Sequence, residues 1–195
     1  MLFPWDLGGR MVKSWLEAHW VAGAAFMGGA LLLFLPGIAA DPALRLVYLA
    51  SPLYMLHQIE EHAGDRFRRY VNGTVFGGVQ ALTVWDVLVI NLPGVWGLNL
   101  IAFYAALLCG PGWGLAAAYL ILVNGIAHVG MAARFRGYNP GLVTGALVFI
   151  PFGLVSLIQI PAGVGEHVVG LVVSLLVHAG IMVRVKANAG AARPA

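Results

Sequence analysis

The chain has 195 residues, of which 61% are hydrophobic and only 10% are charged. Soluble domains carry about 25% charged residues, so this composition excludes an ordinary soluble domain and indicates an integral membrane protein. The single cysteine, Cys109, excludes an internal disulfide, a thiolate metal cluster and a Cys-x-x-Cys redox pair. The net charge of +3 comes mostly from basic residues that follow apolar segments, so it does not indicate nucleic-acid binding.

The first 19 residues lack the apolar core and small-residue cleavage site of a secretory signal. They contain Trp5 and Trp15, and tryptophan is enriched at the membrane–water interface. We therefore expect residues 1–19 to form an interfacial segment that lies on the membrane.

Six apolar windows follow, and their length and continuity predict transmembrane helices rather than barrel strands. The third is longer than a bilayer requires and contains Asn91-Leu92-Pro93-Gly94, which predicts a kink or a break at mid-depth. The predicted fold is therefore an all-α integral membrane bundle of about six transmembrane helices in a single domain, 1–195. The predicted spans are residues 20–40, 44–63, 79–108, 113–133, 141–160 and 166–185.

Basic residues gather before the first window and after the second, fourth and sixth windows, whereas the opposite loops hold almost none. Because cytoplasmic loops carry an excess of lysine and arginine, this alternation predicts that both the N and C termini are cytoplasmic. After the last window the sequence becomes rich in alanine and glycine, and we expect residues 187–195 to be a disordered tail.

Ionisable side chains in four of the windows lie at a similar depth, in the half of the membrane predicted to face the cytoplasm. An ionised residue at the centre of a span costs about 2.5–3.5 kcal/mol, so such a cluster is a candidate functional site. On one helix, residues three and four apart share a face, which predicts that the histidine and both glutamates of His57-Gln58-Ile59-Glu60-Glu61 face together. The members of the layer are His57, Glu60, Glu61, Asp86, His128 and His178.

Imidazole together with carboxylate predicts a divalent metal site for iron, zinc or manganese, with one or two ions. The expected ligands are His57, Glu60, Glu61, His128 and His178. Asp86 is expected to be a further ligand or to orient one, and a glutamate that is not a ligand would act as general acid or base. Asn124 projects from the same side as His128, and His62 points away from the His57 face, so both are expected to lie around the ligands.

The His57-Gln58-Ile59-Glu60-Glu61 string, followed by Asn124-x-x-x-His128 and Tyr138-Asn139-Pro140-Gly141, resembles the HXXEE family of small multi-span bacterial membrane proteins. The resemblance runs over most of the chain from the second window onward. It implies a polytopic protein of the bacterial inner membrane with a metal or acid/base site, and it supplies no reaction. The position of the Tyr138 segment just after His128 suggests a loop that closes over the site.

Two classes of function fit these residues. The first is a membrane metalloenzyme acting on a lipid or other hydrophobic small molecule, with oxidative chemistry if the metal is iron and hydrolysis if it is zinc; carboxylate richness favours iron. The alternative is a proton- or cation-coupled transporter using the same residues, although a transport route would need polar groups across the whole membrane. Haem ligation by two histidines is a third alternative, but it leaves the glutamate pair unexplained. The sequence leaves open whether the chain forms a homo-oligomer.

Overall fold

A computed structural model of the chain describes residues 4–38 and 41–192, and these residues form helices joined by short connections, with no strand among them. The longer helices are α1 (Pro4–Phe34), α2 (Pro42–His62), α5 (Gly97–Cys109), α6 (Leu115–Phe135), α8 (Ile150–Gln159) and α9 (Val164–Ala191). The shorter ones are η1 (Leu35–Gly37), η2 (Ala63–Asp65), α3 (Arg66–Tyr70), η3 (Val71–Val75), α4 (Val84–Val89), η4 (Ile90–Trp96), η5 (Pro111–Gly114), α7 (Leu142–Thr144) and η6 (Gly145–Phe149).

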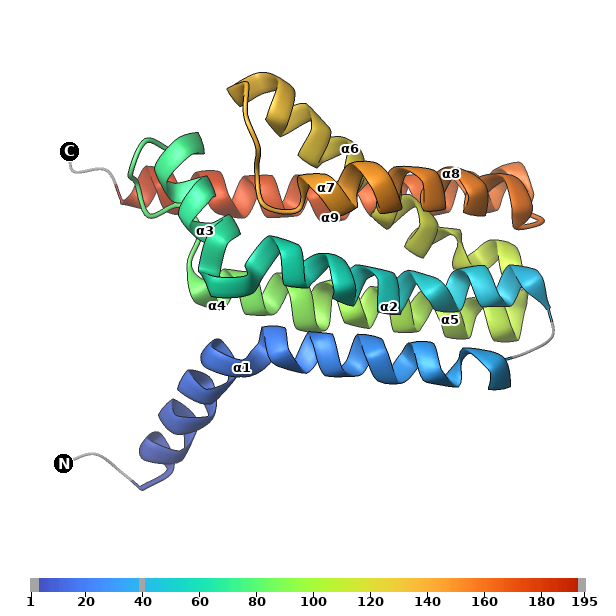
Figure 1. Ribbon diagram of the computed structural model, residues 1–195, viewed down its shortest axis with the longest axis horizontal. Coiled ribbons are helices and arrows are strands. Elements are labelled where there is room, and N and C mark those ends of the chain that lie inside the picture. Colours follow the sequence, from blue (N-terminus) through green and yellow to red (C-terminus); the bar gives the residue numbers. More distant parts are fainter. Residues whose placement is uncertain (1–3, 39–40, 193–195) are drawn as a thin grey trace.

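The chain passes along the long axis of the bundle six times, so that its two ends lie at the same end of the molecule (Figure 1). Five of these passes are long and apolar enough to cross a membrane: Met11–Gly37, Val84–Cys109, Pro111–Phe135, Leu142–Gln159 and Val164–Ala191. The sixth, α2, is not among them; it contains Arg45 and the two motif glutamates and packs against α1, α5 and α6. The predicted all-α membrane bundle is confirmed.

Large apolar side chains cover the outside of the bundle, as expected where lipid is the solvent. Leu33 is 83% exposed, and Leu108 and Ile158 are each 78% exposed. Several polar side chains, such as Gln58, Asn99 and His128, are in contrast buried between the helices. The chain is therefore a multi-pass helical membrane protein, and the orientation predicted from its basic residues stays a prediction.

The third pass does not break at Asn91–Gly94, because the helix continues through the wide π-helical turns of η4 into α5. A π-helical turn moves the backbone hydrogen bonds by one residue, and this accommodates Pro93, which has no N–H to donate. The same turns direct Asn91 into the bundle, where its side chain is 4% exposed.

The C-terminal tail differs from the prediction, since α9 continues as a helix to Ala191. The Asn188 side chain donates to the Ala81 carbonyl and to Asp86 Oδ2, at 3.1 and 2.9 Å, and Ala189 is buried. These contacts hold residues 187–191 against the start of α4, so the prediction of disorder is wrong for them; residues 193–195 lie outside the described residues. At the other end, the first turns of α1 leave the bundle at an angle (Figure 1), and residues 1–3 of the predicted interfacial segment and 39–40 of the first predicted span are not described.

Two glycines bring α6 and η6 into backbone contact. A Cβ atom on Gly125 would lie 2.7 Å from the Gly145 carbonyl oxygen, and one on Gly145 would lie 3.2 Å from Cβ of His128. Because no side chain separates these helices, the start of the fifth pass packs directly against His128. This contact positions the candidate site.

Candidate metal centre

Three buried side chains from α2 and α6 meet at one point. His57 and Glu61 lie one helical turn apart on α2, and His128 faces them from α6; their exposures are 0%, 5% and 1%. Glu61 Oε2 is 3.4 Å from His57 Nε2, and Glu61 Oε1 is 3.5 Å from His128 Nε2. Each residue offers one ligand atom, and these atoms all lie within 4.8 Å of one another.

The hydrogen bonds of Thr144 determine the tautomer of His57, and therefore which of its nitrogens carries the lone pair. Thr144 Oγ1 donates to Glu60 Oε2 at 2.5 Å, so its hydrogen is already used. His57 Nδ1 lies 2.6 Å from Thr144 Oγ1 and must then be the donor in that contact. The neutral ring therefore carries a lone pair on Nε2, and this buried nitrogen has no hydrogen-bond partner among the described residues.

Asn139 fixes the second imidazole in the same way. Its Nδ2 donates to the His128 carbonyl at 2.9 Å, which identifies Oδ1 as the acceptor for His128 Nδ1 at 2.7 Å. His128 therefore carries its hydrogen on Nδ1 and turns a lone pair on Nε2 toward Glu61. Metal-bound histidines in proteins commonly make this second hydrogen bond.

With both imidazoles neutral, two nitrogen lone pairs and a carboxylate converge without a hydrogen between them. Such an arrangement is repulsive in a buried, low-dielectric place unless a cation stands at its centre. A divalent cation requires neutral imidazoles and an ionised carboxylate, and in the neutral rings these hydrogen bonds place both Nε2 lone pairs on the side of Glu61. The donor set therefore fits a metal ion.

Gly141 leaves room beside the two rings. Its φ angle is +96°, and a Cβ atom at this position would lie 2.5 Å from Cε1 and 2.9 Å from Nε2 of His128, and 2.9 Å from Cε1 of His57. The connection between α6 and α7 therefore lies directly on both imidazoles, and it does so because residue 141 has no side chain.

Glu60 does not join the group, although the helical spacing predicted that it would face with Glu61. Its carboxylate accepts hydrogen bonds from the Tyr138 hydroxyl (3.0 Å), the Val143 N–H (3.0 Å) and the Thr144 N–H (2.7 Å). Glu60 lies apart from the three-residue group because these hydrogen bonds hold its side chain on the outer side of α2. The two glutamates of the motif thus have different surroundings: Glu61 faces the histidines, and Glu60 holds the Tyr138–Thr144 segment over them.

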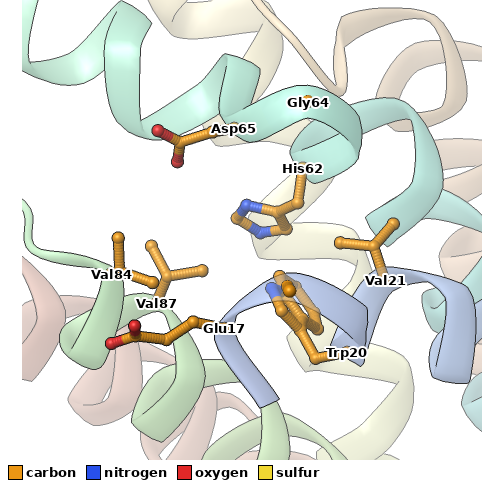
Figure 2. Close-up of a pocket in the computed structure, with 9 residues that line it drawn as sticks. Glu17, Trp20, Val21, His62, Gly64, Asp65, Val84 and Val87 are labelled. Atoms are coloured by element: carbon orange, nitrogen blue, oxygen red, sulfur yellow. The ribbon is translucent and has the colours of Figure 1, made fainter. Parts of the chain in front are cut away.

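His62 reaches the group from the opposite side of Glu61. It is 6% exposed, more buried than the sequence suggested, and its Nε2 is 3.0 Å from Glu61 Oε2. Figure 2 shows the ring pointing from the end of α2 toward Trp20 of α1, and the two ring centroids are 4.9 Å apart. His62 and Trp20 line a cavity of about 350 Å³, and Glu17 and Asp65 also belong to its wall (Figure 2). The rings of Trp20 and Phe67 both pack against His62.

A chain of amides behind the group was not predicted from the sequence. Trp96 Nε1 donates to Gln58 Oε1, and Gln58 Nε2 donates to Asn91 Oδ1, both at 2.8 Å. Asn91 Nδ2 then lies 3.2 Å from His62 Nε2. Gln58 is not one of the residues that the HXXEE motif specifies, so only its polarity within an apolar helix could have drawn attention to it. Thr144 carries no such signal at all.

The other predicted site residues lie outside the three-residue group. Asp86 caps the start of α4, accepting from Thr83 Oγ1 at 2.6 Å, and pairs with Arg184 Nε at 2.9 Å. His178 donates from Nδ1 to the Ser174 carbonyl of its own helix at 2.8 Å. Asn124 lies one turn before His128 and has a buried Oδ1 without a hydrogen-bond partner among the described residues.

A cavity of about 460 Å³ adjoins the group. Its size falls in the range of about 300–1,000 Å³ that ligand pockets occupy. Most of its wall is apolar, with side chains from η3, α4, η4, α6 and α9. Apart from Tyr54, the polar side chains in the wall are Glu61, His62, Asn91, Asn124, His128 and His178.

Comparison with known proteins gives a family and no function. No curated protein and no solved structure matches the chain. Residues 48–156, more than half of the chain, match the family described as "Protein of unknown function with HXXEE motif". The match spans His57, Glu60, Glu61, His128 and the Tyr138–Gly141 segment, and it ends before α9. The chain is therefore a member of the HXXEE family, and the motif that names the family supplies two of the three residues of its candidate metal centre.

Proposed function

We propose that the protein is a membrane-embedded, metal-dependent enzyme acting on a lipid or another hydrophobic small molecule. The observation that carries the proposal is the convergence of His57 Nε2, His128 Nε2 and the Glu61 carboxylate at the wall of a mostly apolar cavity. The three ligand atoms support the presence of a metal ion, and the mostly apolar cavity supports a hydrophobic substrate beside it.

The donor set narrows the chemistry. Two histidines and one carboxylate with open positions are typical of non-haem iron oxygenases, where the iron supplies oxygen activation. The same set also occurs in zinc enzymes, in which the metal lowers the pKa of a bound water for hydrolysis. We favour iron with hydroxylation, desaturation or oxidative cleavage of the substrate. Glu61 and His128 line the cavity, so a substrate there would lie against the ligands.

The residues around the group would orient the ligands. Thr144 and Asn139 hold both imidazoles with their Nε2 lone pairs inward, and Glu60 holds Thr144. Such partners of metal ligands typically contribute about 10–100-fold in metal affinity. This assigns Glu60 a role in positioning, and Glu61 the role of ligand.

Elemental analysis of detergent-purified protein tests the proposal. The wild type, Glu61→Gln, His128→Ala and the control His167→Ala would be purified without chelators and reconstituted with Fe(II), Zn²⁺ or Mn²⁺. We expect one equivalent of metal in the wild type and in His167→Ala, because His167 lies in the first turns of α9 and contacts Tyr119 of α6. We expect a loss of metal in the two site variants. Each variant would be checked for folding by its thermal melt.

The identity of the metal distinguishes the chemistries, since iron supports oxidation and zinc supports hydrolysis. Absence of stoichiometric metal from the wild type after reconstitution would contradict the proposal. The result would then favour a proton-coupled transporter that uses the same buried histidines and glutamate.

A further inference from the structure

The cavity beside the candidate metal centre has hydrogen-bonding groups that the centre does not use. Glu61 and His128 belong to the three-residue group, and His62 and Asn91 contact each other. Tyr54 can donate or accept through its hydroxyl, so it does not favour one kind of ligand. Asn124 and His178 remain, on α6 and α9.

Both of these residues present acceptors. Asn124 Oδ1 is buried and has no hydrogen-bond partner among the described residues. His178 Nδ1 must donate to the Ser174 carbonyl, because a carbonyl oxygen can only accept, so the neutral ring carries its lone pair on Nε2. No described residue is hydrogen-bonded to that nitrogen. A buried acceptor without a partner, such as Asn124 Oδ1, destabilises the protein, and a ligand that donates a hydrogen bond removes this penalty.

We infer that the cavity binds a single-chain amphiphile with an uncharged hydrogen-bond donor at its head, such as a long-chain alcohol, and that Asn124 Oδ1 accepts the one hydrogen of this head group. The inference rests on the proposed function in taking the cavity as the substrate site. A carboxylate head group would present only acceptors to these two acceptors. A charged ammonium would have to leave water for a mostly apolar cavity. A hydroxyl donates its one hydrogen to Asn124 Oδ1 without either penalty, and the apolar wall contacts the hydrocarbon chain.

Binding of two isosteric probes tests the inference: a medium-chain primary alcohol and the methyl ether with the same number of heavy atoms, which cannot donate. Dissociation constants would be obtained from ligand-dependent thermal shifts of metal-depleted protein in detergent. Metal depletion ensures that a bound metal does not itself select the alcohol. We expect the alcohol to bind the wild type about two- to tenfold more tightly than the ether, as one hydrogen bond typically contributes.

Asn124→Leu should remove this preference while leaving ether binding intact. His167→Phe lies on α9 outside the cavity wall and should keep the preference. Equal binding of the two probes by the wild type, or no binding of either, would overturn the inference, and this comparison needs no variant to fold. Metal content is measured separately. A wild type that binds metal but binds both probes equally would refute only this inference. A wild type that prefers the alcohol but binds no metal would refute only the proposed metal-dependent enzyme.

Discussion

Substitution of Gly141 with alanine would test the geometry of the metal centre with the addition of a single methyl group. The added Cβ would lie 2.5 Å from His128 Cε1 and 2.9 Å from His57 Cε1. Carbon atoms in contact prefer separations of about 3.5–4.0 Å, so the rings would have to move by about 1 Å. Metal–ligand distances tolerate only about 0.2 Å, and the site would therefore be lost or severely weakened.

The backbone adds a second cost. Residue 141 has a φ angle of +96°, a region that side chains other than glycine rarely adopt. We assign about 1–2 kcal/mol to this strain, which would lower the melting temperature by a few degrees. The expected result is a folded, slightly destabilised protein whose metal affinity falls by at least about 10–100-fold, as when other groups that orient a metal ligand are lost.

Gly137→Ala is the matched control. It lies in the same connection, and the nearest atom to its added Cβ, the Phe135 carbonyl oxygen, would be 3.9 Å away. Metal affinity would be measured for both variants by competition with a chelator, and melting temperature by a thermal scan. We expect the control to match the wild type. Wild-type metal affinity in a folded Gly141→Ala protein would refute the placement of the ligands.

Three further predictions concern the residues around the group. Thr144→Val preserves shape but removes the acceptor for His57 Nδ1, so metal affinity should fall about 10–100-fold; unchanged affinity in the chelator assay would contradict the assigned tautomer. Asp86→Ala should lower the free energy of unfolding by about 1–3 kcal/mol through loss of its buried hydrogen bonds and its pair with Arg184, while elemental analysis finds full metal content; a loss of metal would make Asp86 a ligand after all. Partial burial and the hydrogen bond to Glu60 raise the pKa of Tyr138. The Tyr138 hydroxyl therefore contributes to stability below about pH 10, and this contribution is lost as pH rises through the folded-state pKa. Melts of Tyr138→Phe and wild type should therefore converge above that pH, and a constant difference would show that the tyrosine hydroxyl is not the cause.

Much of the architecture could be predicted from the sequence because lipid imposes strong constraints. Composition excluded a soluble domain, and the apolar windows predicted helices that the structure contains. The expectation for residues 187–191 failed because alanine and glycine content describes only local preference, whereas Asn188 is held by hydrogen bonds to residues about a hundred positions earlier. Of the kink or break expected at Asn91–Gly94, the break is not found, because π-helical turns accommodate Pro93 without ending the helix.

For the site, the sequence by itself determined which chemical groups are available: imidazoles and carboxylates in apolar helices, where each must find a partner because burial of an unpaired polar group is costly. It also placed His57 and Glu61 on one helical face, since the 3.6-residue period fixes neighbours four apart. Only the tertiary structure decided that Glu60 turns outward, that Asp86 pairs with Arg184, and that Thr144 and Asn139 orient the two imidazoles. These choices depend on contacts between residues up to 98 positions apart, as in the pair of Asp86 and Arg184, and helical periodicity describes only neighbours within a few turns.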